Sequence, residues 1–199
     1  MRTRVLGIDA SLGSTGWCVG ELAGPVFTRV ASGAVAQPKI ENMTLDQRIG
    51  RLRANRNDMA LILRDHGPFS LILLEDYAHN IGQGAHQAGE WGGVLRTLIQ
   101  DRGHPLRVVN VMHVKQFATG DAHAKKDAMR LGAFKHWGFE AKTNDEVDAY
   151  VICRMGAAIV ADAAGFPLSG YATSYQAGVL HVVIHGKPKP KPKKEKAAT

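Results

Sequence analysis

Two short apolar stretches of this chain each end in a single acidic residue, and this pattern constrains the fold more than any other feature. Residues 5–8 run directly into Asp9, and residues 71–74 run directly into Glu75. A short, nearly continuous apolar run is typical of a strand that is covered on both faces. Because ligands gather at the carboxyl ends of the strands in open α/β sheets, we expect both carboxylates to line a functional site.

A second pair of acids, Asp145 and Asp148, opens an apolar segment that is predicted to be a helix. Their three-residue spacing places them on one helical face. Asp145 falls in the first turn, where the helix dipole favours negative charge and acids are common for structural reasons. Asp148 lies one turn further in, with apolar residues on both sides, so a purely solvated role suits it poorly.

Ionised carboxylates at the ends of buried elements are costly unless positive charge lies between them. A pair of Mg²⁺ ions meets this need, because hard cations take oxygen ligands from a few carboxylates and from substrate phosphates. We therefore expect two Mg²⁺ ions, replaceable by Mn²⁺, to be bound by Asp9, Glu75, Asp145 and Asp148. This set of residues is typical of metal-dependent phosphodiester cleavage.

Basic residues precede the acidic helix, and the relevant ones are Lys115, His123, Lys125 and Lys126. Lysines bind phosphates as point charges. A solvated helix face is the alternative for any single lysine, but the clustering beside the acids favours contact with a DNA backbone for Lys115 and Lys126. His123 fits an exposed loop just as well.

The composition describes an ordinary globular domain. The chain has 199 residues, of which 45% are hydrophobic and 22% charged, which is enough for one sizeable core. Its start lacks a secretory pattern, and the apolar residues 149–164 are broken by Arg154 and Asp162, so we expect a cytoplasmic protein without membrane contact. Cys18 and Cys153 lack metal-ligand spacing and are predicted to be buried free thiols.

The hydrophobic patterning predicts an α/β fold with a mixed five-stranded sheet flanked by helices, in βββαβαβα order. Strands are expected at residues 4–9, 15–22, 26–36, 69–75 and 106–111, and helices at 44–66, 87–101, 125–137 and 143–164. Two helix starts carry a capping-box signature, Thr44 with Gln47 and Thr143 with Glu146. Residues 165–184 fit either a short hairpin or a C-terminal packing segment.

Taken in order, these motifs resemble the RuvC-type Holliday junction resolvases of the RNase H-like superfamily, in a phage or bacterial version. Any one motif is weak, but the ordered set is fairly specific and covers residues 4–164, most of the chain. The matching pieces are Leu6-Gly-Ile-Asp9 with Thr15-Gly16, Glu75, a glycine-containing helix at 89–94, Val114-Lys115-Gln116 with Lys126, and Asp145-x-x-Asp148-Ala149.

The resemblance implies Mg²⁺-dependent paired nicking of four-way or branched DNA by a homodimer, in a bacterial cell or phage-infected host. It implies metal binding by the four acids and contact of Lys115 and Lys126 with the scissile region, so Lys126 joins the acids as a catalytic candidate. The expected RuvC-type nuclease domain spans residues 1–184, and a disordered basic tail spans 185–199.

One departure from the family pattern concerns junction recognition. In well-known members a phenylalanine three residues after the glutamate wedges into the junction. This chain has Ala78 there, between Tyr77 and His79. Tyr77 is the candidate substitute, and it completes a predicted DNA-binding set of Lys115, Lys125, Lys126, Tyr77 and His123.

Other functions share parts of this pattern. Actin-like kinases and ATPases also begin with Gly-Ile-Asp, but they need two such domains, and Gly92-Gly93 falls inside a predicted helix rather than an adenosine-binding loop. Failure to bind ATP in a titration would exclude this class. A junction-binding protein without catalysis and an RNase H-like nuclease acting on RNA are further alternatives. The four acids argue against an inactive protein, whereas RNA and DNA offer the metals the same phosphates.

The C-terminal residues 187–199 carry six lysines and one glutamate, a net charge of +5 out of +7 for the whole chain. Alternating Lys and Pro cannot form a helix, so this arm is expected to be extended and solvated. Deleting it should leave cleavage at saturating DNA nearly unchanged but weaken binding. The slope of log affinity against log salt should become shallower by up to about five phosphate contacts. Identical salt series for the full-length and truncated proteins would show a passive tail.

Overall fold

The computed structural model describes residues 3–11, 13–38, 40, 42–76, 84–166 and 173–186. The strands within these ranges are β1 (Thr3–Asp9), β2 (Ser14–Ala23), β3 (Val26–Ala36), β4 (Leu71–Glu75) and β5 (Leu106–Val109). The helices are α1 (Leu45–His66), α2 (Gly84–Asp101), α3 (Val111–Thr119), α4 (Lys126–Trp137), α5 (Asn144–Ala163) and α6 (Ser174–His185). Residues 187–199 of the predicted tail lie outside the described residues, whereas α6 runs to His185, one residue past the predicted domain boundary at 184.

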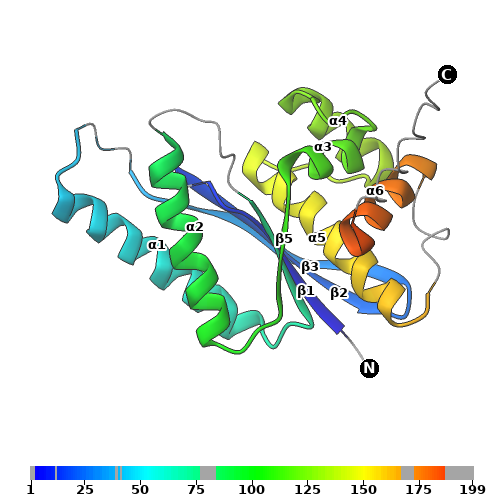
Figure 1. The fold of residues 1–199 in the computed structure, drawn as a ribbon, viewed down its shortest axis with the longest axis horizontal. Coiled ribbons are helices and arrows are strands. Elements are labelled where there is room, and N and C mark those ends of the chain that lie inside the picture. The colour runs from blue at the N-terminus through cyan, green and yellow to red at the C-terminus, as the bar shows by residue number, and fades with distance from the viewer. Residues whose placement is uncertain are drawn as a thin grey trace, which may run out of the picture.

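The five strands form one mixed sheet in the order β3-β2-β1-β4-β5. The first three strands are an antiparallel meander, whereas β4 pairs parallel to β1 and β5 pairs parallel to β4. Helices α1 and α2 cover one face of the sheet, and α5, with α3, α4 and α6, covers the other (Figure 1). The predicted α/β class and mixed five-stranded sheet are therefore confirmed.

The central strands are buried on both faces and divide their side chains between two cores. On β1, Leu6 and Ile8 pack with Trp91 on the side of α1 and α2, whereas Val5 packs with Ile152 on the side of α5. Successive residues of a strand point to opposite faces. Asp9 therefore shares the orientation of Val5 and faces α5.

The register of the parallel pair sets the two strand-end acids side by side. Ile8 is opposite Leu74 in the β1–β4 ladder, and Asp9 and Glu75 are the next residue on each strand. Both strands run in the same direction, so the two carboxylates meet at the same edge of the sheet. Asp76 follows Glu75 and points to the opposite face, as expected.

Helix α5 lies against the backbone of β1 and β2 because two glycines allow a very close approach. A Cβ added at Gly7 would overlap the backbone of Cys153, and one at Gly16 would overlap the carbonyl group of Asp145. Gly16 is also the cross-strand partner of Asp9. The first turn of α5 is thereby pressed against the strand end that carries Asp9.

Helix α3 was not predicted, and the expected strand at 106–111 ends two residues early. The side chain of Asn110 accepts a hydrogen bond from the backbone N–H of Met112 and starts the helix, and Gly120 ends it in the left-handed conformation. Lys115 therefore lies on a helix. An asparagine cap is a signal that the sequence already contained.

The C-terminal described segment is helix α6, so the hairpin alternative for residues 165–184 was wrong and the packing alternative was right. Thr173 and Gln176 form a reciprocal capping box at its start. The side-chain amide of Gln176 then donates a 3.0 Å hydrogen bond to the carbonyl oxygen of Phe117, which fixes α6 on α3.

Several smaller predictions also have outcomes. The capping box of Thr44 and Gln47 is present with both hydrogen bonds. At α5, Thr143 accepts from the backbone N–H of Glu146, while the Glu146 side chain bonds elsewhere. Cys18 and Cys153 are free and buried, as predicted. Among the described helices, none combines the length and the apolar character that a membrane span requires.

Replacing Gly16 with alanine should destabilise the protein by about 1–3 kcal/mol, because the added methyl group must push α5 away from β2. Urea unfolding measures this change. Gly50→Ala is the matched control, because Gly50 is exposed on α1 with open space around it, and alanine there should stabilise by about 0.5–1 kcal/mol. Equal stability of the two variants would contradict the close packing of α5.

Candidate active site

The four predicted acids come together from three elements at one end of the sheet. Burial raises the pKa of Asp9 well above its usual range, and the negative charges of Glu75, Asp148 and Asp145 raise it further. Lys126 opposes this shift. Because charges act on one another in this way only at short range, the strand ends and the start of α5 form a single acidic cluster.

The pKa values of Glu75 and Asp148 are raised by burial and by neighbouring acids in the same way. Burial, followed by the charge of Asp148, raises the pKa of Glu75 to about 8, with Lys115 opposing the shift. Burial, followed by the charge of Asp145, raises the pKa of Asp148 to about 6, with Lys126 and Lys115 opposing it. Both carboxyl groups therefore lie in an enclosed environment that also holds neighbouring acids.

Two of the predicted lysines lie beside the acids. Lys115 on α3 lowers the pKa values of Glu75 and Asp148, and Lys126 in the first turn of α4 lowers those of Asp9 and Asp148. These lysines come from two helices that pack against α5. The structure thus joins the basic and acidic motifs of the sequence in one place.

The other predicted DNA-binding residues are less closely tied to the cluster. Lys125 is the exposed residue immediately before α4, and its side chain makes no capping hydrogen bond. His123 is exposed, and its backbone N–H donates to the Asp121 side chain in a turn. Tyr77 lies outside the described residues. Contact of these three residues with DNA stays a prediction.

Hydrogen bonds hold the start of α5 in place from both sides. The Arg130 guanidinium donates to the carbonyl oxygen of Ala141 (2.8 Å) and to the Asn144 side chain (3.3 Å), which ties α4 to the residues before Asp145. Across the sheet edge, the Ser32 hydroxyl donates to the Glu146 carboxylate at 2.8 Å. Sequence reasoning missed Arg130 and Ser32, because their partners are distant in the chain.

A buried pair of hydrogen bonds supports the turn after Asp9. The Thr15 hydroxyl donates to the carbonyl oxygen of Ser11 and accepts from the Trp91 indole N–H, each at 2.8 Å. Thr15 and Trp91 are fully buried. This link fastens the turn to α2, and Thr15 belongs to the Thr-Gly motif noted in the sequence.

Asp76 has the structural role that its position suggested. It forms a 2.6 Å ion pair with Arg96 on α2, on the other face of the sheet from the acidic cluster. Its neighbour Glu75 faces α5 instead. Two adjacent acids therefore serve different sides of the sheet, as the alternation of a strand requires.

The donor set of the cluster fits hard divalent cations. Among the described residues, no three His, Cys, Asp or Glu side chains stand in the arrangement of a preformed metal site. The acids nevertheless offer carboxylate oxygens, the ligands that Mg²⁺ and Mn²⁺ prefer. Their mutual repulsion, which Lys115 and Lys126 only partly offset, is the kind that a bound cation relieves.

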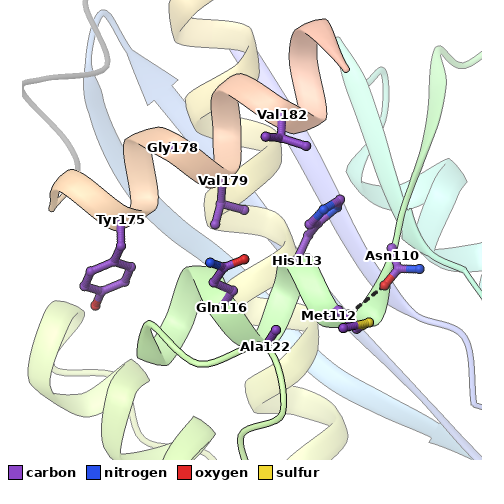
Figure 2. A pocket seen from close by; sticks show the side chains of 9 residues that line it. All are labelled: Asn110, Met112, His113, Gln116, Ala122, Tyr175, Gly178, Val179 and Val182. Carbon is purple, nitrogen blue, oxygen red and sulfur yellow. Dashed lines mark hydrogen bonds between the residues drawn. The ribbon is translucent and has the colours of Figure 1, made fainter. Parts of the chain in front are cut away.

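A separate cavity of about 470 Å³ lies between α3 and α6. Figure 2 shows that its lining comes from the start of α3, the loop that follows α3, and one side of α6. None of the predicted site residues that the structure describes lines it, and its α6 wall includes Val179 and Val182. This cavity is therefore distinct from the acidic cluster.

The fold and the cluster together define an α/β protein with a carboxylate-lined site at one end of its sheet. A scan against models of known families finds no match. The sequence is, however, similar to crossover junction endodeoxyribonucleases RuvC. It is 25% identical to that of Methylobacillus flagellatus over 130 residues, which cover 65% of this chain and 72% of the relative. It is 26% identical to that of Ruegeria pomeroyi over 150 residues, which cover 75% of this chain and 87% of the relative.

Solved structures agree on the fold. The Thermus thermophilus RuvC structure matches with a TM-score of 0.61 and 20% sequence identity, covering 86% of this chain and 99% of that one. T. thermophilus RuvC in complex with a Holliday junction substrate matches with a TM-score of 0.63 and 19% identity, covering 82% and 97%. The resemblance to RuvC and the RNase H-like fold expected from the motifs are confirmed.

Without divalent cations, the protein should lose stability as the pH rises from about 5 to 8. The pKa of Glu75 rises from 4.5 to about 8 in the folded state, so the folded protein holds this proton more tightly. The resulting stabilisation is complete below pH 4.5 and is lost as the pH rises through 8. We expect a loss of roughly 2 kcal/mol, because Glu75 keeps some contact with solvent.

Urea unfolding in EDTA at several pH values measures this effect. Glu75→Gln should flatten the pH dependence, whereas Glu140→Gln, which removes an exposed carboxylate, should preserve it. A parent protein whose stability does not change between pH 5 and 8 would contradict the crowding of the acids.

Proposed function

We propose that the protein is a divalent-metal-dependent endonuclease that resolves Holliday junctions and related branched DNA by paired nicks. The observation that carries the proposal is the cluster of Asp9, Glu75, Asp145 and Asp148, whose charges act on one another, with Lys115 and Lys126 beside it. The RuvC names of the relatives, and the Holliday junction in one matching structure, point to the substrate.

The acids would hold two Mg²⁺ ions, with Mn²⁺ as a substitute. When bound, such cations stabilise the charge that develops on the phosphodiester and help to generate a nucleophile from water. The protein's own part is to keep four carboxylates at a fixed point: two are set by the β1–β4 register and two by the first turns of α5. Side chains on strands and helices keep such positions better than side chains on loops.

An acidic site repels an anionic DNA strand, and the lysines reduce this repulsion. Lys115 and Lys126 place positive charge next to the carboxylates from α3 and α4, and each can bind a phosphate oxygen. We assign them to the DNA backbone at the scissile position, with Lys125, His123 and Tyr77 as further contacts. The positive charge of the two lysines thus partly neutralises the acids and also attracts the DNA.

A four-way junction presents two equivalent strands, so paired nicks require two active sites related by symmetry. A homodimer with a two-fold axis supplies them, and two-fold dimers are the commonest protein assemblies. A cytoplasmic location, where such DNA is processed, belongs to the same proposal.

Replacing Asp148 with asparagine should reduce cleavage of a four-way junction by about 10³-fold or more, because it removes a carboxylate from the centre of the cluster. Junction binding should persist, since Lys115 and Lys126 remain. Asp162→Asn, the same change near the other end of α5, is the matched control and should cleave at nearly the parent rate. Cleavage by the Asp148 variant near the parent rate in Mg²⁺ would show that the site assignment is wrong.

The substrate is tested with labelled four-way junction, duplex, fork and RNA–DNA hybrid under the same conditions. Symmetric nicks that need Mg²⁺ or Mn²⁺, disappear in EDTA and are confined to four-way or branched DNA support the proposal. Preferential cleavage of the hybrid would instead assign the site to an RNA-directed nuclease.

A further inference from the structure

An open cleft of about 740 Å³ runs along β3, the edge strand next to β2, and the residues that lead into α5. Residues 32–34 form its strand side, and residues 139–143 form its opposite side. Exposed cations stand on both sides, Arg29 on the strand and Lys142 before the helix, and two carboxylates, Glu140 and Glu146, line the cleft with them. None of the acids of the proposed active site lines this cleft.

Three polar side chains of the cleft are connected by hydrogen bonds. The Arg29 guanidinium donates to the Ser32 hydroxyl at 3.1 Å, and this hydroxyl donates to the Glu146 carboxylate at 2.8 Å. Arg29 also lies 5.7 Å from the centre of the buried Phe139 ring. A guanidinium has five N–H donors, so Arg29 can keep its bond to Ser32 and still bind an anion.

The cleft lies close to the proposed active site. Ala34, on its strand side, pairs with Gly16, which pairs with Asp9 on the next strand. Two strand spacings place Ala34 roughly 10 Å from Asp9. In stacked DNA that distance corresponds to about three nucleotides along a strand.

We propose that this β3 cleft binds a nucleotide of the substrate strand about three nucleotides from the scissile phosphate, with Arg29 and Lys142 holding its phosphate. The inference rests on the proposed endonuclease function and adds a binding site that the acidic cluster does not supply. Glu146, fixed by Ser32, is a carboxylate acceptor inside the cleft, and carboxylates accept hydrogen bonds from the amino group of cytosine. The cleft thereby offers a means of reading the sequence near the cut.

A nucleic acid strand suits this cleft better than a protein strand added to the edge of β3. Strand addition relies on backbone hydrogen bonds and on pockets for alternate side chains. Here the cations stand on opposite sides of the cleft, which suits a charged backbone that lies between them. The first turn of α5 covers Gly16 between the cleft and Asp9, so a strand bound at both sites passes over this turn.

The first test measures binding to a synthetic four-way junction in EDTA, so that no cleavage occurs. The double variant Arg29→Gln/Lys142→Gln should bind about tenfold more weakly, because a hydrogen bond to a charged group is worth about 1.5 kcal/mol or more. The matched control is Arg107→Gln/Lys135→Gln, which removes the same charge from exposed positions on β5 and α4. Equal affinities of the two double variants would overturn the proposal.

The second test locates the contact with neutral methylphosphonates placed singly at each phosphate near the cut. In the parent protein, the substitution about three nucleotides from the cut should weaken binding about tenfold, while the Arg29/Lys142 variant should lose little more at that position. Equal sensitivity of both proteins there would assign the contact elsewhere.

The outcomes separate this inference from the function on which it rests. A parent protein that binds junctions but never cleaves them would refute the nuclease and leave the cleft to be judged by affinity. Absence of junction binding would refute both. A second copy of this chain is the other possible occupant of the cleft, and light scattering tests for it. If the Arg29/Lys142 variant alone changes its oligomeric state, the cleft is an interface between copies of this chain and the proposal is wrong.

Discussion

The contact between the backbone of α5 and the two strands beneath it is the constraint on which the rest of the structure depends. Only glycine at positions 7 and 16 permits this approach, because any side chain there would occupy the space of the helix backbone. The approach brings Asp145 and Asp148 within range of Asp9 and Glu75, at a large electrostatic cost. The packing of two glycines therefore creates the charged site, and the hydrophobic cores on both faces of the sheet maintain it.

Much of this arrangement could be predicted from local patterns. The acid-terminated apolar runs gave β1 and β4 with the correct carboxyl ends, and the three-residue spacing gave the shared face of Asp145 and Asp148. The features that could not be predicted depend on partners far away in the chain. Arg130 reads as a surface residue until residues 141 and 144 are placed next to it, and Ser32 until Glu146 faces it. Helix α3 was a different failure, because its Asn110 cap was visible but the apolar residues before it suggested a longer strand.

Neither the lysine motif nor the acidic motif is informative alone. A lysine in a helix is usually solvated, and an acid after a strand is usually solvated, so each pattern by itself favours a structural interpretation. Their ordering along the chain carries the information, because it reproduces the order of a known family. The fold converts that order into proximity, since α3 and α4 are inserted between the last strand and the acidic helix.

The site is assembled from β1, β4, α3, α4 and α5, whose contributions are spread from Asp9 to Asp148. No single continuous segment of the chain contains all the residues of the site. Contacts of such long sequence separation form only when the whole domain is organised. A nascent, truncated or partly unfolded chain therefore presents isolated acids and lysines instead of the assembled cluster, so the proposed nuclease activity requires the whole folded domain.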